Sequence, residues 1–90
     1  MPTARISKRT VDATTPQDRD TYLWDSELKG FGVKVTPPGH KVYLVQYRLG
    51  GRKGRTRRVT IGRHGTLTAE QARTTAKHIL GEVSAGRDPA

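Results

Sequence analysis

The most informative segment of the chain is KVYLVQYRLGGRKGRTRRVTI, residues 41–61. Residues 41–49 are rich in β-branched and aromatic side chains and include neither Gly nor Pro, a composition typical of a strand. Residues 55–61 end in Val59 and Ile61, two β-branched apolar residues separated by one Thr. The intervening loop contains three glycines, which readily adopt positive φ angles at a chain reversal. The segment therefore predicts a β-hairpin, which its arginines and lysines make basic.

A further strand is expected just before the hairpin, at about residues 31–36. Phe31, Val33 and Val35 alternate there with small or polar residues, the period of a strand with one buried face. The sequence PPGH at 37–40 then turns the chain into the hairpin. We therefore predict three consecutive antiparallel strands, at about 31–36, 41–49 and 55–61.

One strong helix is predicted after the sheet, at about residues 69–85. Thr68 is a suitable N-cap, Gln71 completes a capping box with it, and Gly86 suits the position just after the helix. The apolar residues form one stripe: Ala72, Ala76, Ile79, Leu80 and Val83. This stripe has to be buried, and the apolar face of the sheet offers the surface for it. The predicted fold class is therefore α+β, with a three-stranded antiparallel sheet packed on one C-terminal helix in two layers.

The first twenty residues carry weaker signals. They are polar, and we expect a loosely ordered, mobile basic N-terminal arm at residues 1–20. Ser7 can cap a short helical turn there, with Ile6 and Val11 as its apolar anchors.

Residues 21–25 predict a short edge strand, because Tyr22 and Trp24 alternate with Leu23. We expect Trp24, the only tryptophan, to cap one end of the core. The alternative is that its ring stacks on a ligand.

The charge of the chain is strongly positive and unevenly placed. The 90 residues carry a formal charge of +9, and no acidic residue occurs between Leu28 and Ala69, where ten Lys or Arg are found. Such an excess attracts polyanions, nucleic acid first and an anionic membrane second. The alternative is a solvated basic surface that keeps the protein soluble. No cysteine and no long apolar run are present, so we expect neither a disulfide nor a membrane span.

The sequence offers no recognisable catalytic constellation. His40, His64 and His78 lack metal-ligand spacing and are interpreted as surface or loop histidines. The glycine-rich loop at 50–54 joins two strands and does not open a helix, so it does not resemble a phosphate-binding loop in its context. We therefore predict a non-catalytic chain with no metal, no cofactor and no small-molecule substrate.

The face of the sheet that the helix leaves open is predicted to bind nucleic acid. It is expected to carry Lys34, Thr36, Gln46, Arg48, Arg58 and Thr60, and the hairpin loop adds Arg52, Lys53 and Arg55. The two face arginines suit guanine, the glutamine suits adenine, and the threonines suit a thymine methyl group; the lysine suits a base or a phosphate, and the loop cations suit phosphates. For the threonines, plain β propensity is an equal alternative, as is a solvated polar position for the glutamine.

Duplex DNA is favoured over single-stranded RNA. RNA platforms present aromatic rings on the open face, whereas Tyr43 and Tyr47 lie in register with apolar Val45 on the core face. Two alternatives remain: an RNA-binding module of ribosomal type, and a protein-interaction domain. The latter would use the helix face that carries Arg73, Lys77 and Glu82.

Short motifs follow one another in order between Thr21 and Ala90. They are Trp24-Asp25, Lys29-Gly30-Phe31-Gly32-Val33-Lys34-Val35-Thr36, Gly39, Lys41, Tyr47-Arg48, Gly51-Arg52, Arg57-Arg58-Val59-Thr60-Ile61-Gly62-Arg63, Leu67-Thr68, Glu70, Ala72-Arg73 and Gly86-Arg87-Asp88-Pro89. In this order and spacing the chain resembles the N-terminal arm-DNA-binding domain of phage-type tyrosine recombinases, the integrases of prophages and genomic islands.

The resemblance implies a function and a domain layout. Residues 21–85 would form the arm-DNA-binding domain, and 86–90 would begin a linker to a core-binding domain and then a catalytic domain that holds the nucleophilic tyrosine. The sheet would enter the major groove of duplex DNA at arm-type sites and support DNA integration and excision. Partners would be double-stranded DNA and other recombinase protomers, with no membrane, in a bacterial cytoplasm and at the nucleoid.

Overall fold

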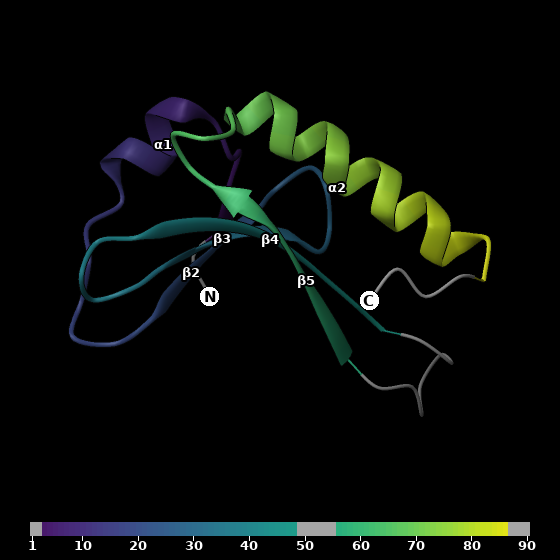
Figure 1. Cartoon of the computed structure of the whole chain (residues 1–90), viewed down its shortest axis with the longest axis horizontal. Helices are drawn as coiled ribbons and strands as arrows, with labels where there is room; N and C mark the ends of the chain where they lie inside the picture. Colours follow the sequence, from purple (N-terminus) through teal and green to yellow (C-terminus); the bar gives the residue numbers. More distant parts are fainter. Residues whose placement is uncertain (1–2, 49–55, 87–90) are drawn as a thin grey trace.

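The computed structural model describes residues 3–48 and 56–86. Its elements in chain order are β1 (Thr3–Ala4), α1 (Lys8–Ala13), β2 (Thr21–Asp25), β3 (Phe31–Val35), β4 (Lys41–Arg48), β5 (Thr56–Arg63) and α2 (Ala69–Ser84). The strands form one five-stranded sheet in the order β1-β2-β3-β4-β5, in which β1 runs parallel to β2 and all other pairs are antiparallel. Figure 1 shows α1 and α2 on the same side of the sheet. The α+β class with a C-terminal helix is confirmed.

The predicted number of strands is wrong, because the sheet has five strands and is mixed. The three expected strands are present as β3, β4 and β5, although residues 49 and 55 at their predicted ends lie outside the described part. The expected edge strand, β2, pairs with β3 from Thr21↔Val35 to Trp24↔Gly32. The fifth strand, β1, has only two residues and pairs with a strand about twenty residues away, so no local pattern reveals it.

The strand β5 extends two residues beyond its predicted end at Ile61. A register shift lies opposite Tyr43 and Leu44, where Tyr43 pairs with Gly62 and Leu44 pairs with Thr60. Ile61 is the extra residue of this β-bulge. Gly62, the first residue past the predicted strand, continues it, and a Cβ there would lie 2.7 Å from Leu67 Cδ1, so its lack of a side chain leaves room for leucine.

Helix α2 begins and packs as its sequence predicts. The Thr68 backbone N–H donates to Gln71 Oε1 at 3.0 Å, and the Gln71 backbone N–H donates to Thr68 Oγ1 at 3.1 Å. Gly86 follows the helix with a φ of +85°. The predicted stripe faces the sheet, since Ala72, Ala76 and Ile79 are buried and Leu80 and Val83 are partly buried. They pack with the sheet residues Phe31, Val33, Tyr43, Val45 and Tyr47.

The N-terminal segment contributes to this core. Ser7 caps α1 through a capping box with Thr10, and the predicted anchors Ile6 and Val11 are fully buried. Lys41 Nζ also donates to the backbone oxygen of Val11 at 2.7 Å, which links α1 to β4. The helical turn is thus confirmed, while the mobility of residues 1–20 stays a prediction. The linker at residues 86–90 also stays a prediction, since only Gly86 lies in the described part.

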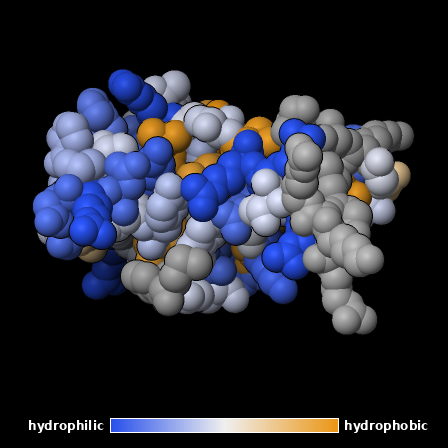
Figure 2. Space-filling view, turned by 90° about the horizontal axis from the view of Figure 1, so that it is seen from below, coloured by the Kyte–Doolittle hydropathy of each residue, from blue (hydrophilic) through white to orange (hydrophobic). Residues whose placement is uncertain are grey.

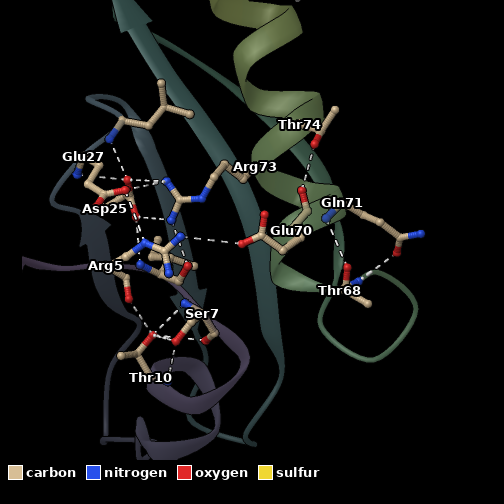
Figure 3. A network of polar contacts seen from close by, with 12 residues as sticks. Arg5, Ser7, Thr10, Asp25, Glu27, Thr68, Glu70, Gln71, Arg73 and Thr74 are labelled. Carbon is tan, nitrogen blue, oxygen red and sulfur yellow. Dashed lines mark hydrogen bonds and ion pairs between the residues drawn. The ribbon is translucent and has the colours of Figure 1, made fainter.

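A buried ion pair joins the sheet to α2 (Figure 3). Arg73 donates to both carboxylate oxygens of Asp25, at 2.7 and 2.8 Å, and to the backbone oxygen of Ile6 at 2.9 Å. Burial alone would raise the pKa of Asp25, but hydrogen bonds from Arg73 and from the backbone of Ile6 and Leu28 outweigh it and lower the pKa to about 2. The alternative of a protein-interaction domain placed Arg73 on a helix face at the surface, and that placement is wrong: its side chain is 7% exposed.

Candidate nucleic-acid interface

The sheet face opposite α2 gathers the predicted polar side chains. Paired residues on neighbouring strands point to the same side, and Gln46 pairs with Arg58, Leu44 with Thr60, and Lys34 with Val42. The alternation along β4 adds Arg48 to that side, and Thr36, the residue directly after β3, continues the alternation of that strand. We call this surface the open face; among its described residues it carries all six predicted face residues, Lys34, Thr36, Gln46, Arg48, Arg58 and Thr60. The three predicted loop cations, Arg52, Lys53 and Arg55, lie outside the described residues.

A groove of about 290 Å³ crosses the open face. Its floor contains Val42 and Leu44 of the central strand, its flanks include Lys34 and Arg58, and Thr36, Thr60 and Tyr22 complete the lining. Figure 2 views the molecule from this side and shows apolar groups set between strongly hydrophilic ones. The open face therefore combines cations with an apolar strip.

Arg58 is held in place by neighbours on two other strands. Its Nε donates to Gln46 Oε1 at 2.9 Å, and its Nη1 donates to the Tyr22 hydroxyl at 2.9 Å. The guanidinium carbon also lies 4.9 Å from the centroid of the Tyr22 ring, within range of a cation–π interaction. A guanidinium fixed in this way has lost much of its rotamer freedom before it meets a ligand. The oxygen of Gln46 that was expected to face a base already accepts a hydrogen bond from Arg58.

Two aromatic rings lie on the open face, contrary to prediction. Tyr22 and Trp24 stack with centroids 5.8 Å apart and planes 8° apart. Trp24 lies over Gly32, where a Cβ would come within 2.7 Å of Trp24 Cε3. The expectation that Trp24 caps the core is therefore wrong, because Leu23 takes the core side of β2 and Gly32 leaves room for the indole on the other side. The sequence shows Gly32, but its pairing with Trp24 follows only from the register of β2 and β3.

An acidic residue neighbours one of the face cations. Lys34 Nζ lies 3.3 Å from Asp20 Oδ2, and both side chains are more than a third exposed. An exposed pair of this kind contributes little to stability, since solvent screens it. Its relevance is to binding, because Asp20 offsets a positive charge at the rim of the groove.

The histidine most enclosed by its surroundings, His64, has a structural role. Its ring nitrogens lie 2.6 Å from the Tyr43 hydroxyl and 2.7 Å from Asp12 Oδ1, which links β4 and α1 to the end of the sheet. Burial, with a smaller contribution from Asp12, raises the pKa of Tyr43 to about 12. Within residues 3–48 and 56–86, no three His, Cys, Asp or Glu side chains are grouped so that they could hold a metal ion.

Fold and surface together define the class of the protein. A small two-layer α+β domain with net charge +9, whose uncovered sheet face carries cations around an apolar groove, is of the nucleic-acid-binding type. The model of a family described as the arm DNA-binding domain matches residues 6–90, nearly the whole chain. The chain belongs to this family, the arm DNA-binding domain of phage integrases, as the motif pattern predicted. No curated protein matches it.

The family assignment identifies the partner. The arm domain is a DNA-binding domain of the non-catalytic kind, so DNA is the expected partner. No helix in the described part of the chain is both long and apolar enough to span a membrane.

Proposed function

We propose that this domain binds duplex DNA in a sequence-specific manner at arm-type sites, with its open face in the major groove, and thereby supports integration and excision by a recombinase. In this proposal residues 86–90 lead toward the core-binding and catalytic domains of that enzyme. The major groove of B-DNA admits a small sheet and presents a distinct donor and acceptor pattern for each base pair.

The observation that carries the proposal is the grouping of six predicted residues on one uncovered sheet face. Four of them, Lys34, Gln46, Arg48 and Arg58, bring donors to that face from three adjacent strands. The opposite face is occupied by α2 and the core. A ligand that approaches the cations therefore meets β3, β4 and β5 side by side.

Within the face we assign the leading role in base recognition to Arg58. A bidentate arginine contact with O6 and N7 is the commonest way to recognise guanine, and it requires a well-positioned guanidinium. Gln46 and Tyr22 supply that positioning. In this assignment Gln46 acts chiefly through Arg58. Arg48, at the exposed end of β4, reads a base or contacts phosphate.

Alanine substitution tests the assignment. Arg58→Ala should weaken the preferred duplex by about 1–3 kcal/mol and reduce the preference over a scrambled duplex. Lys77→Ala is the matched control, because it removes one positive charge from an exposed residue of α2, away from the open face. If Arg58→Ala and Arg48→Ala leave affinity and preference at the level of Lys77→Ala, the proposed site is wrong.

The loop cations have a different signature. Arg52, Lys53 and Arg55 are proposed to contact phosphates, so removing one should weaken all duplexes about equally. The slope of log K against log salt should fall by roughly one for each phosphate that the domain no longer neutralises. This uniform effect separates phosphate contacts from base recognition.

The aromatic pair gives a second candidate function some support. Stacked rings on an open sheet are the feature of single-stranded RNA platforms, and Tyr22 and Trp24 lie on the open face. Against this, Arg58 lies over the Tyr22 ring and Gly32 lies beneath Trp24, so neighbouring groups already contact both rings. A competition experiment decides between the two functions. Unlabelled duplex DNA should displace a labelled duplex from the domain at far lower concentration than single-stranded RNA does, and the reverse order would favour RNA.

A further inference from the structure

The floor of the groove departs from the usual pattern of an open sheet. Val42 and Leu44 are apolar, yet they occupy same-face positions of β4 on the side away from α2. The intervening residue, Tyr43, serves the core on the other side and is fully buried. An antiparallel strand with one solvated face normally alternates apolar and polar residues. Packing against the helix therefore does not account for this apolar pair.

The side chains around the pair narrow the range of ligands. Lys34 pairs directly with Val42, Thr60 pairs with Leu44, and Arg58 lies further along β5. These flanks provide hydrogen-bond donors and positive charge beside an apolar floor. The floor can contact a methyl group, and the flanking donors can bond to acceptors beside it, so a ligand with acceptors next to a methyl group would use both parts of the groove.

The β-bulge contributes to the hollow. Thr60 pairs with Leu44 and Arg63 pairs with Val42, so two residues separate successive open-face positions of β5 instead of one. Bulges are frequent beside binding sites, where they redirect side chains. Here the bulge widens the spacing of side chains next to Val42, on the β5 side of the groove.

Among the base edges in the major groove, thymine has the matching chemistry. It presents the C5-methyl group, the one apolar group there, beside the O4 acceptor. Cytosine at the same position would present no methyl group and would turn its N4 amino donor toward the cationic donors of the protein. We propose that the groove receives the C5-methyl group of a thymine against Val42 and the Thr60 methyl group, and so selects thymine over cytosine at one position of the DNA site. This inference rests on the proposed function and specifies the base that the groove recognises.

The test begins with the intact 90-residue chain and a pool of randomised duplexes. Rounds of selection identify the preferred duplex, and a scrambled version of it serves as the reference. Each thymine of the preferred duplex is then replaced in turn by deoxyuridine, which removes the methyl group and leaves the base-pairing edge unchanged. Affinity is measured by fluorescence anisotropy. At one position we expect a loss of roughly threefold to fivefold, the size expected for burying one methyl group.

Two variants assign the effect to the groove. Val42→Thr keeps the shape and β propensity of the side chain but exchanges a methyl group for a hydroxyl, and Thr60→Ser removes the methyl group of the threonine. Both should reduce the thymine-over-uracil ratio toward one. Thr74→Ser is the matched control: Thr74 is an exposed residue of α2 whose hydroxyl bonds to the Glu70 backbone oxygen, a bond that serine can also make.

The possible results separate the thymine subsite from the proposed function. A ratio of roughly threefold to fivefold that persists in Thr74→Ser and falls toward one in Val42→Thr and Thr60→Ser supports the inference. If the preferred duplex binds specifically but every uracil substitution is neutral, or if Val42→Thr retains the ratio, the inference is overturned while the proposed function stands. If no duplex is selected above the scrambled reference, the proposed function itself fails, and the thymine subsite fails with it.

Discussion

Replacing Arg73 with alanine should destabilise the domain severely, although Arg73 is remote from the open face. The substitution leaves the buried carboxylate of Asp25 without its bidentate partner, and breaking a buried pair in this way costs about 3–5 kcal/mol. Asp25 keeps backbone donors from Ile6, Glu27 and Leu28, so we expect the lower end, about 3 kcal/mol. A chain of this length has a total stability of about 5–13 kcal/mol. The melting temperature should fall by roughly 10–25 °C.

Chemical denaturation measures this loss, and Arg5→Ala provides a matched control. Arg5 forms an ion pair with Glu27 at 3.3 Å, but both side chains are more than half exposed. Such a pair is expected to contribute less than about 1 kcal/mol. Equal unfolding free energies for Arg73→Ala and Arg5→Ala would show that the buried pair does not stabilise the domain. Arg73→Lys, which keeps the charge but loses the planar fork, should fall between them.

The same pair predicts an acid dependence. The pKa of Asp25 is about 2 in the folded protein and 3.8 in its ordinary state, so the unfolded chain binds the proton more readily. The stabilisation is therefore fully present above about pH 4 and is lost as the pH falls through 2, by about 2 kcal/mol. The difference in stability between the wild-type chain and Arg73→Ala should shrink over that range. A difference that stays constant from about pH 4 to about pH 2 would contradict the assignment.

Two further substitutions should be favourable, one for DNA affinity and one for stability. Asp20→Asn should raise affinity for every duplex severalfold at low salt, because it removes a negative charge 3.3 Å from Lys34. Asp18→Asn, at another exposed residue of the same loop, is the control. An equal gain in affinity there would mean that only the net charge of the chain matters. Gly81→Ala should raise the unfolding free energy by about 0.5–1 kcal/mol, because alanine favours a helix and a Cβ at that position meets nothing within 4 Å. Thermal denaturation measures the change, and a lower melting temperature would show that the backbone there requires glycine.

Local sequence signals were sufficient for the second half of the fold. The hairpin strands follow from residue composition, β3 from its alternation, and α2 from a capping box and an apolar stripe. Each of these signals comes from residues that are close together in the sequence. The same alternation predicted which side of β3, β4 and β5 carries Lys34, Gln46 and Arg58, since the pleat assigns each residue to a face.

The features that the sequence did not reveal depend on distant partners. The Asp25–Arg73 pair spans 48 residues, and an arginine on a helix gives no local sign that it will be buried. Strand β1 is two residues long and pairs with a strand that lies beyond α1. The position of Trp24 depended on a glycine in the neighbouring strand, so the face of β2 could be assigned only once the register with β3 was known.

The arrangement of the open face also changes how its residues are interpreted. Considered singly, Gln46 and Arg58 were expected to contact separate bases. In the structure they are hydrogen-bonded to each other, and Tyr22 completes the set from β2. Substituting Gln46 should therefore mimic, in weaker form, the substitution of Arg58.

Binding of the wild-type chain to duplexes tiled across an attachment region, the kind of target that the proposed function implies, is the most direct test of sequence recognition by the open face. Fluorescence anisotropy at two salt concentrations, with a scrambled duplex as reference and Arg58→Ala in parallel, separates specific from general attraction. We expect tight binding to a few short repeats that survives the higher salt and that Arg58→Ala largely abolishes. Equal binding to every duplex, lost at the higher salt and indifferent to Arg58, would contradict the claim that the open face recognises a DNA sequence.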